Sequence, residues 1–165
     1  MLKRIIKYYI LGITLTAIFS LFVAISVSAE EQVIVPEDVK EISEELGQAY
    51  NICPELIQAI CWRESRFQTD AENGGCIGIM QVSPRWHKDR MDKLGVTDLM
   101  DPKQNMEVAV DYLADLVEDE EDMEEALMRY HGESRIQERL DAGKMSAYVE
   151  SILALSAELE IKNGK

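Results

Sequence analysis

Apolar side chains recur at helical spacing from residue 36 onward. Val39, Ile42 and Leu46 stand at i, i+3 and i+7, which is one face of a helix, and Pro36 suits its first position. The same period and the usual boundary residues predict further helices along the chain. The predicted helices cover about 36–51, 54–67, 101–117, 123–130 and 146–161.

A polar stretch separates the second predicted helix from the third. It runs over 69–75, and the pair Gly74-Gly75 is a turn signal. No alternating run of apolar and polar residues is long enough for a substantial sheet, and no internal repeat is present. We predict a mainly α, single compact helical domain with at most a short hairpin near 73–82.

The first 29 residues have the pattern of an export signal. Lys3, Arg4 and Lys7 precede an uncharged apolar run, and the small residues Ser28 and Ala29 suit a cleavage site. The run is also long enough to span a bilayer, so an uncleaved membrane anchor is the alternative. The protein is expected to be exported, and either secreted or associated with the cell envelope. The predicted divisions are a signal peptide or anchor at 1–29, a linker at 30–35 and one domain at 36–162.

Composition and charge exclude several classes of function. Of the 165 residues, 47% are hydrophobic, which suits one domain with a real core. There are 17 Lys and Arg residues against 31 Asp and Glu residues, giving a net charge of −14. Binding to nucleic acid or to anionic lipid needs clustered cations, so neither is expected. No metal is expected, because His87 and His131 show no ligand spacing with the three cysteines.

One carboxyl stands on an apolar helix face. Ile57, Ile60, Glu64 and Phe67 follow at i, i+3, i+7 and i+10, so Glu64 belongs to the apolar stripe. Burial disfavours an ionised carboxylate and raises its pKa, which is what a general acid needs near neutral pH. The alternative is a glutamate at a helix end that turns to solvent or pairs with a neighbouring arginine.

Four motifs follow one another in a fixed order. They are Trp-Arg-Glu-Ser-Arg-Phe at 62–67, Gly-Ile-Met-Gln-Val-Ser-Pro at 78–84, Leu-Met-Asp-Pro-Lys-Gln-Asn at 99–105 and Ala-Leu-Met-Arg-Tyr at 126–130. Together they resemble the soluble lytic transglycosylase family, which has an α+β lysozyme-like fold, and the resemblance covers about 40–160. The chain departs from the family pattern at His131, where the family usually has Asn after the tyrosine, and this leaves the role of that Asn open.

The resemblance implies a substrate cleft around a catalytic Glu64. The residues that it implies for contact with substrate are Ser65, Gly78, Met80, Gln81 and Tyr130. Ser65 is expected to orient the substrate or the carboxyl, and Tyr130 to hydrogen-bond Glu64. Gly78 permits close approach of a sugar chain, Met80 forms a soft apolar wall, and Gln81 hydrogen-bonds sugar groups. Purely structural roles for Ser65, Met80 and Tyr130 are the alternatives.

Other motif residues leave two interpretations open. Trp62 and Trp86 either stack on sugar rings or pack against the core. Asn105 is interpreted as structural rather than catalytic. Cys53 and Cys61 are eight residues apart on one helix, a rise of about 12 Å that no disulfide spans. A Cys61–Cys76 disulfide is predicted instead, and three reduced thiols are the alternative.

No second catalytic carboxylate stands out in the sequence. Asp70, Glu72 and Asp89 are nearest to the acid along the chain, and none belongs to a motif. A single acid fits the reaction that the resemblance implies, cleavage of peptidoglycan between N-acetylmuramic acid and N-acetylglucosamine with formation of a 1,6-anhydro sugar. That reaction needs no cofactor. The alternatives are a hydrolytic lysozyme of the same fold and a non-catalytic peptidoglycan-binding protein, and delivery by a cell-envelope machine is left open.

Overall fold

The computed structural model describes residues 32–119 and 122–165. The chain separates into a segment Met1–Ile34 and a unit Val35–Lys165, and the fold below is that of the second. The predicted signal peptide or anchor at 1–29 lies outside the described residues. Among the helices that are described, none combines the length and apolar character needed to cross a membrane.

Helices make up nearly all of the regular structure in the described residues. In chain order they are α2 (Glu37–Tyr50), α3 (Pro54–Ser65), α4 (Pro84–Leu94), α5 (Pro102–Asp119), α6 (Met123–Tyr130), α7 (Ile136–Asp141) and α8 (Ala147–Lys162). A hairpin of two short antiparallel strands, β1 (Glu72–Asn73) and β2 (Cys76–Ile77), follows α3. This architecture confirms the predicted mainly α, lysozyme-like class with one short hairpin.

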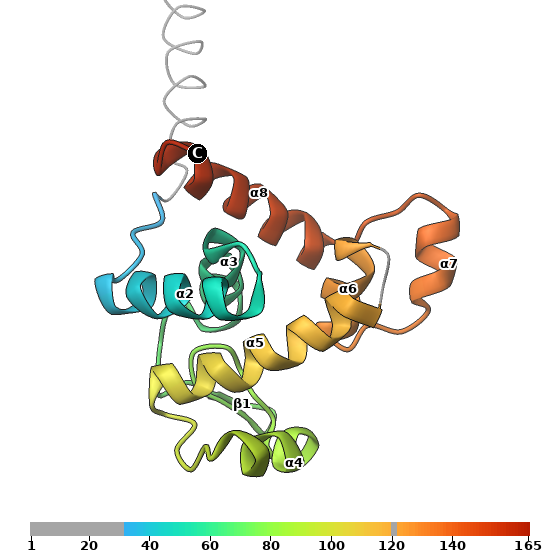
Figure 1. Ribbon diagram of the computed structural model, residues 1–165. Helices are drawn as coiled ribbons and strands as arrows, with labels where there is room; N and C mark the ends of the chain where they lie inside the picture. Colours follow the sequence, from blue (N-terminus) through green and yellow to red (C-terminus); the bar gives the residue numbers. More distant parts are fainter. Residues whose placement is uncertain (1–31, 120–121) are drawn as a thin grey trace, which may run out of the picture. The chain divides into compact units, whose positions relative to one another are not determined.

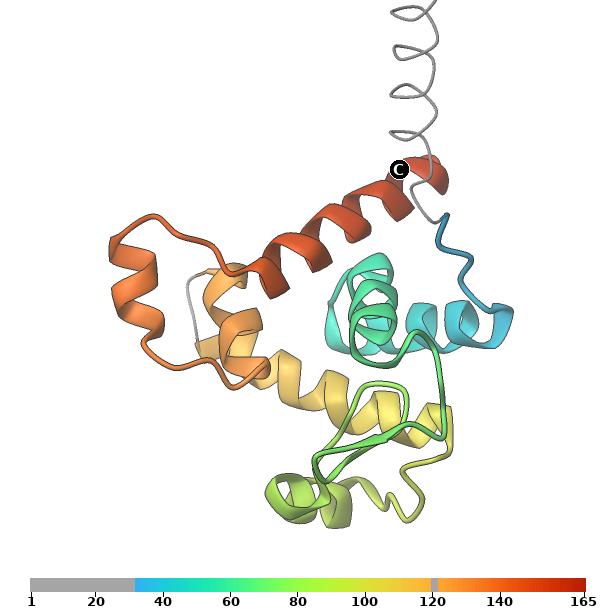
Figure 2. The same cartoon turned by 180° about the vertical axis from the view of Figure 1, so that it is seen from behind.

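The core forms around α3. In both views α3 lies between α8 and α5, and α2 lies beside it (Figures 1 and 2). Helix α8 packs along α3, α2 packs on α3 and α5, and α6 packs on α5 and α8. The central side chains are fully buried and come from five helices: Val39, Ile57, Ile60, Met106, Val110, Leu113, Leu127, Met128, Val149 and Ile152.

Boundary residues behave as the sequence predicts. Asn51 ends α2 in the left-handed conformation, with φ of 55°. The carboxylate of Asp101 accepts a hydrogen bond from the backbone N–H of Gln104 at 2.8 Å, and so caps the start of α5. The side chain of Gln104 does not complete a capping box, because its oxygen accepts from the N–H groups of Thr97 and Asp98.

Two helices were not predicted from the sequence pattern. Helix α4 contains no buried residue, and α7 has only six residues, also without a buried one. Neither therefore has an apolar stripe of the kind that reveals a helix in a sequence. Helix α4 is nevertheless important for the site, because it carries Trp86 and His87.

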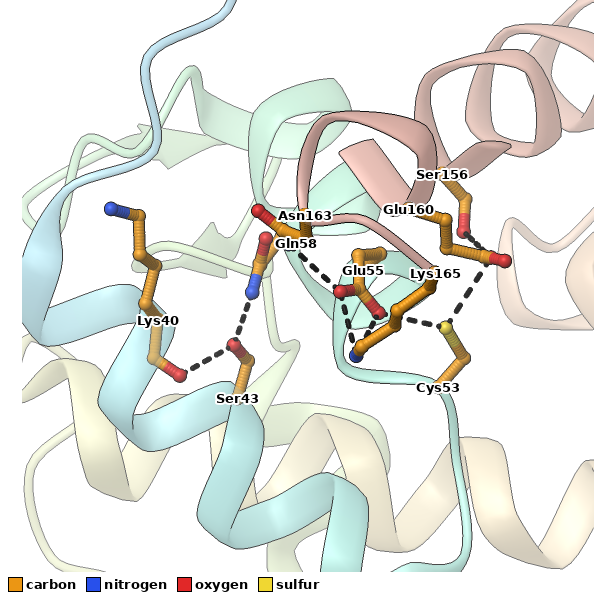
Figure 3. Close-up of polar contacts among 9 residues, drawn as sticks. All are labelled: Lys40, Ser43, Cys53, Glu55, Gln58, Ser156, Glu160, Asn163 and Lys165. Atoms are coloured by element: carbon orange, nitrogen blue, oxygen red, sulfur yellow. Dashed lines mark hydrogen bonds and ion pairs between the residues drawn. The ribbon is translucent and has the colours of Figure 1, made fainter. Parts of the chain in front are cut away.

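A buried polar cluster ties the end of α8 to the start of α3 (Figure 3). Glu55 is 1% exposed and accepts hydrogen bonds from Asn163 at 2.8 Å and from the Lys165 ammonium group at 3.0 Å. The thiol of Cys53 donates to the same carboxylate at 3.2 Å. Burial raises the pKa of Glu55, but the hydrogen bonds from these three groups outweigh it and lower the pKa to about 2.

The predicted disulfide is wrong. Cys53, Cys61 and Cys76 are free thiols, with Cys61 buried in α3 and Cys76 partly exposed on β2. Desolvation raises the pKa of all three thiols.

Candidate active site

Glu64 lies in the last turn of α3, where the chain turns sharply away. Arg66 and Phe67 both adopt positive φ angles, 55° and 65°, so the helix ends abruptly at Ser65. The carboxyl of Glu64 lines a hollow of about 220 Å³. The other residues of this hollow are Asn73, Cys76, Met80, Gln81, Val82, His87, Ala109, Tyr112, Tyr130 and His131.

A second hollow of about 590 Å³ continues from the first. The two share six lining residues, namely Cys76, Gln81, His87, Tyr112, Tyr130 and His131. Trp86, Asp89 and Arg90 of α4 line only the second hollow. We call the two hollows together the cleft. Its continuous wall of aromatic and polar side chains is typical of a site that binds an extended ligand.

The environment of Glu64 favours the protonated acid. Desolvation by burial is the largest influence and raises the pKa of Glu64. The hydroxyl of Tyr148 donates to Oε1 of Glu64 at 2.5 Å and lowers the pKa, as do the charges of His131 and Arg63. The net effect is a raised pKa, so the carboxyl keeps its proton to higher pH than an exposed glutamate does.

The tyrosine that contacts the acid is Tyr148, and the expectation for Tyr130 was wrong. The hydroxyl of Tyr130 donates to the backbone carbonyl of Met80 at 3.1 Å, although its ring lines the cleft beside Glu64. Tyr148 lies at the start of α8, 84 residues from Glu64, and belongs to none of the four motifs. The available signal was its helical spacing to Ile152: a tyrosine on a buried stripe needs a partner for its hydroxyl.

Ser65 and Gly78 fix how the segments that form the cleft pack together. The hydroxyl of Ser65 donates to the carbonyl of Ile79 at 2.8 Å, which joins the end of α3 to the segment after β2. Gly78 has a φ of 80°, and a Cβ there would lie 2.2 Å from both the Asn105 side chain and the Leu99 carbonyl. The close approach of Asn105 and Leu99 thus requires a glycine at this position.

Asn105 fixes the loop that carries the motif after β2. It is fully buried, its amide group donates to the carbonyls of Ile77 and Leu99 at 2.8 Å, and its carbonyl accepts from the Met80 N–H at 2.9 Å. The structural interpretation of Asn105 is confirmed. Its three hydrogen bonds join Ile77, Met80 and Leu99 through their backbone groups and so fix the loop on α5.

Met80 and Gln81 both reach the cleft. Met80 is 1% exposed, so it is a core residue whose side chain also forms part of the cleft wall. Gln81 has a positive φ of 51°, and its amide group donates to the carbonyls of Ala71 and Gly78. These bonds hold the Gln81 side chain in place and occupy its donors.

Aromatic residues divide between the cleft and the surface. His87 contacts Tyr112, whose ring stacks with that of Tyr130. Trp86 is 75% exposed at the edge of the second hollow. Trp62 contacts Phe67 and the Arg66 guanidinium and does not line the cleft.

Glu64 is the only carboxylate among the described residues that line the first hollow. Asp89 lines the second hollow, whereas Asp70 and Glu72 are exposed residues that line neither. The described part of the chain contains no cluster of three or more side chains arranged to hold a metal ion. The first hollow therefore offers one carboxyl with a raised pKa, which is the equipment for proton transfer to a bound ligand.

Comparisons with known proteins agree with this geometry. Residues 41–149 match the family model of the transglycosylase SLT domain. A transglycosylase of Enterobacteria phage PRD1 is 33% identical over 84 residues, which are 50% of this chain and 30% of the phage protein. The match thus spans less than a third of the length of that relative.

Proposed function

Because this chain belongs to the SLT transglycosylase family, we propose that it is a peptidoglycan lytic transglycosylase with Glu64 as its general acid and base. The family supports a transglycosylase type of activity on peptidoglycan. The observation that carries the finer proposal is the isolation of Glu64. Its carboxyl is partly buried and has a raised pKa, and no second carboxylate lines the first hollow among the described residues. Hydrolytic glycosidases usually use two carboxyl groups.

One carboxyl suffices for the intramolecular reaction. Glu64 donates its proton to the glycosidic oxygen as the bond from that oxygen to C1 of N-acetylmuramic acid breaks, and N-acetylglucosamine leaves with the proton. The Glu64 carboxylate then takes the proton of the 6-hydroxyl of the same muramic acid, and the 6-oxygen bonds to C1. The product is a 1,6-anhydro sugar, no water is consumed, and the acid is regenerated.

The rest of the cleft supplies the binding surface for the glycan strand in this proposal. Tyr112 and Tyr130 offer ring surface in the first hollow, and the exposed Trp86 offers a stacking face at the edge of the second. Met80 and Gln81 complete the wall. Because the substrate lies outside the cytoplasm, the proposal also includes export through the segment 1–29.

The test is mass spectrometry of purified peptidoglycan after digestion. The proposal predicts muropeptides that end in 1,6-anhydromuramic acid, lighter by one water than hydrolysed ends. Glu64→Gln keeps the shape of the side chain and removes the proton, so turnover should fall by about 10²–10⁴-fold. Glu150→Gln on the exposed side of α8 is the matched control and should retain full turnover.

Other outcomes decide against the proposal. Products with only reducing ends would mean that water attacks and that the protein is a hydrolytic lysozyme. A folded protein that binds peptidoglycan without cutting it would be a binding module.

A further inference from the structure

The ring of Tyr148 is held by two neighbours from other parts of the chain. The imidazole of His131 stacks on it with ring centroids 3.8 Å apart and planes 6° apart. The guanidinium of Arg63 lies over the same ring, 5.5 Å from its centroid. Tyr148 is 5% exposed, whereas the His131 side chain is 46% exposed, so the histidine forms the outer cover of the phenol.

The backbone at the end of α6 determines where this imidazole lies. The N–H of His131 donates to the Leu127 carbonyl at 3.1 Å, and Gly132 then turns the chain with a φ of 73°. Nδ1 of His131 lies 3.4 Å from a carboxylate oxygen of Glu133, which fixes the ring from one edge. Contacts within its own segment thus help to orient the ring that stacks on Tyr148.

The stack acts on the acid through one hydrogen bond. A phenol that swings by a fraction of an ångström changes the 2.5 Å contact between its hydroxyl and Glu64. Small displacements of catalytic groups are costly, since misplacement by about 1 Å can reduce rates by about 10²-fold. The flat stack on His131 restricts that motion, because two parallel rings in contact lose contact when either one moves.

We infer that His131 is a positioning residue that holds the Tyr148 hydroxyl at hydrogen-bonding distance from Glu64, and this inference rests on the proposed function. The chain therefore uses an aromatic contact between α6 and α8 to orient the carboxyl on α3.

The experiment compares two substitutions of His131 by kcat and KM on purified glycan strands. His131→Ala removes the ring, so kcat should fall about 10-fold while KM changes less than about twofold. His131→Phe keeps the stacking ring and should retain kcat within about threefold of the wild type. His131 is partly exposed, and circular dichroism with a thermal melt will establish that both variants are folded.

A double-mutant cycle with Tyr148→Phe separates positioning from other roles. Without the tyrosine hydroxyl, His131→Ala should lower kcat by less than about twofold further, since the bond that it orients is gone. Three results would overturn the inference: unchanged kcat in His131→Ala, a rise in KM instead, or full additivity with Tyr148→Phe. Each is distinct from failure of the proposed function, in which the wild type itself forms no 1,6-anhydro ends.

Discussion

At the scale of single residues, Glu64 combines two opposing influences on one proton. Burial raises the pKa of its carboxyl, and the bond from Tyr148 partly lowers it. The folded protein therefore binds this proton more tightly than the unfolded chain does, so stability falls as pH rises from the unfolded pKa through the raised folded one. Glu64→Gln is free of this loss.

The stability of Glu64→Gln relative to the wild type should therefore increase between pH 4 and pH 8. Urea unfolding of both proteins at the two pH values measures the difference. Glu150→Gln, at an exposed position, is the matched control. A relative stability that declines over this range would show that the ionised carboxylate is the form the fold prefers.

Gly78 is a second residue whose neighbours dictate its identity. A Cβ at this position would meet Leu99 and Asn105 at 2.2 Å, in addition to the strain of the positive φ. Gly78→Ala should lower the free energy of unfolding by about 2–4 kcal/mol. Gly75→Ala is the control, because its φ is also positive but nothing lies within 4 Å, so only about 1–2 kcal/mol should be lost. Equal losses in urea unfolding would contradict the clash.

At the scale of elements, α4 depends on ion pairs rather than on a core. It has no buried residue, and Arg90 joins it to α5 through Asp111 and, at 2.7 Å, Asp115. The Arg90 guanidinium also lies over the ring of Tyr112. Arg90 thus joins α4, the helix that carries Trp86, to three side chains of α5.

Arg90→Met should destabilise the protein by about 2 kcal/mol, because the nearly buried Asp111 loses its partner. In terms of the proposed function, KM for glycan strands should rise more than kcat falls, since Trp86, Asp89 and Arg90 of α4 line only the second hollow, which Glu64 does not line. Lys88→Met breaks an exposed pair with Asp92 inside α4 and should change neither stability nor KM measurably. Steady-state kinetics and urea unfolding test both variants.

The contrast between helices with and without buried residues explains which helices could be predicted from the sequence. Helices α2, α3, α5, α6 and α8 bury apolar stripes, so their hydrophobic periodicity and boundary residues could be recognised in the sequence. Helix α4 could not be predicted in this way, because its polar side chains are held by residues of α5 that are distant in the sequence. Glu64 could be found from its place on a stripe, but Tyr148 could not be assigned to it, since only tertiary packing brings residues 84 positions apart into contact.

At the scale of the whole molecule, the cluster around Glu55 joins the end of the described chain to the start of α3 (Figure 3). The pKa of Glu55 is lowered to about 2, so its contribution to stability is complete above about pH 4.5 and is lost as pH falls toward 2. Lys165 is half-exposed, so solvent screening limits this contribution to roughly 2 kcal/mol.

Glu55→Gln should accordingly be less stable than the wild type by roughly 2 kcal/mol at pH 6, and the gap should shrink to about a quarter of that value at pH 2.5. Urea unfolding at both pH values tests this expectation. Glu158→Gln, at an exposed position on α8, is the control and should show no such closing gap. A gap that stays constant with pH would mean that shape, not charge, matters at Glu55.

Tyr148 lies in α8, the last of the described helices, so the order of synthesis determines when its contact with Glu64 can form. A growing polypeptide contains Glu64 long before it contains the hydroxyl that completes the acid, and α8 must be made before the flank of α3 is covered. In terms of the proposed function, proton donation by a correctly held carboxyl thus requires a chain that has been translated through Tyr148. Cleavage by a protease before Tyr148 would remove this hydroxyl, while every residue that lines the cleft is still present.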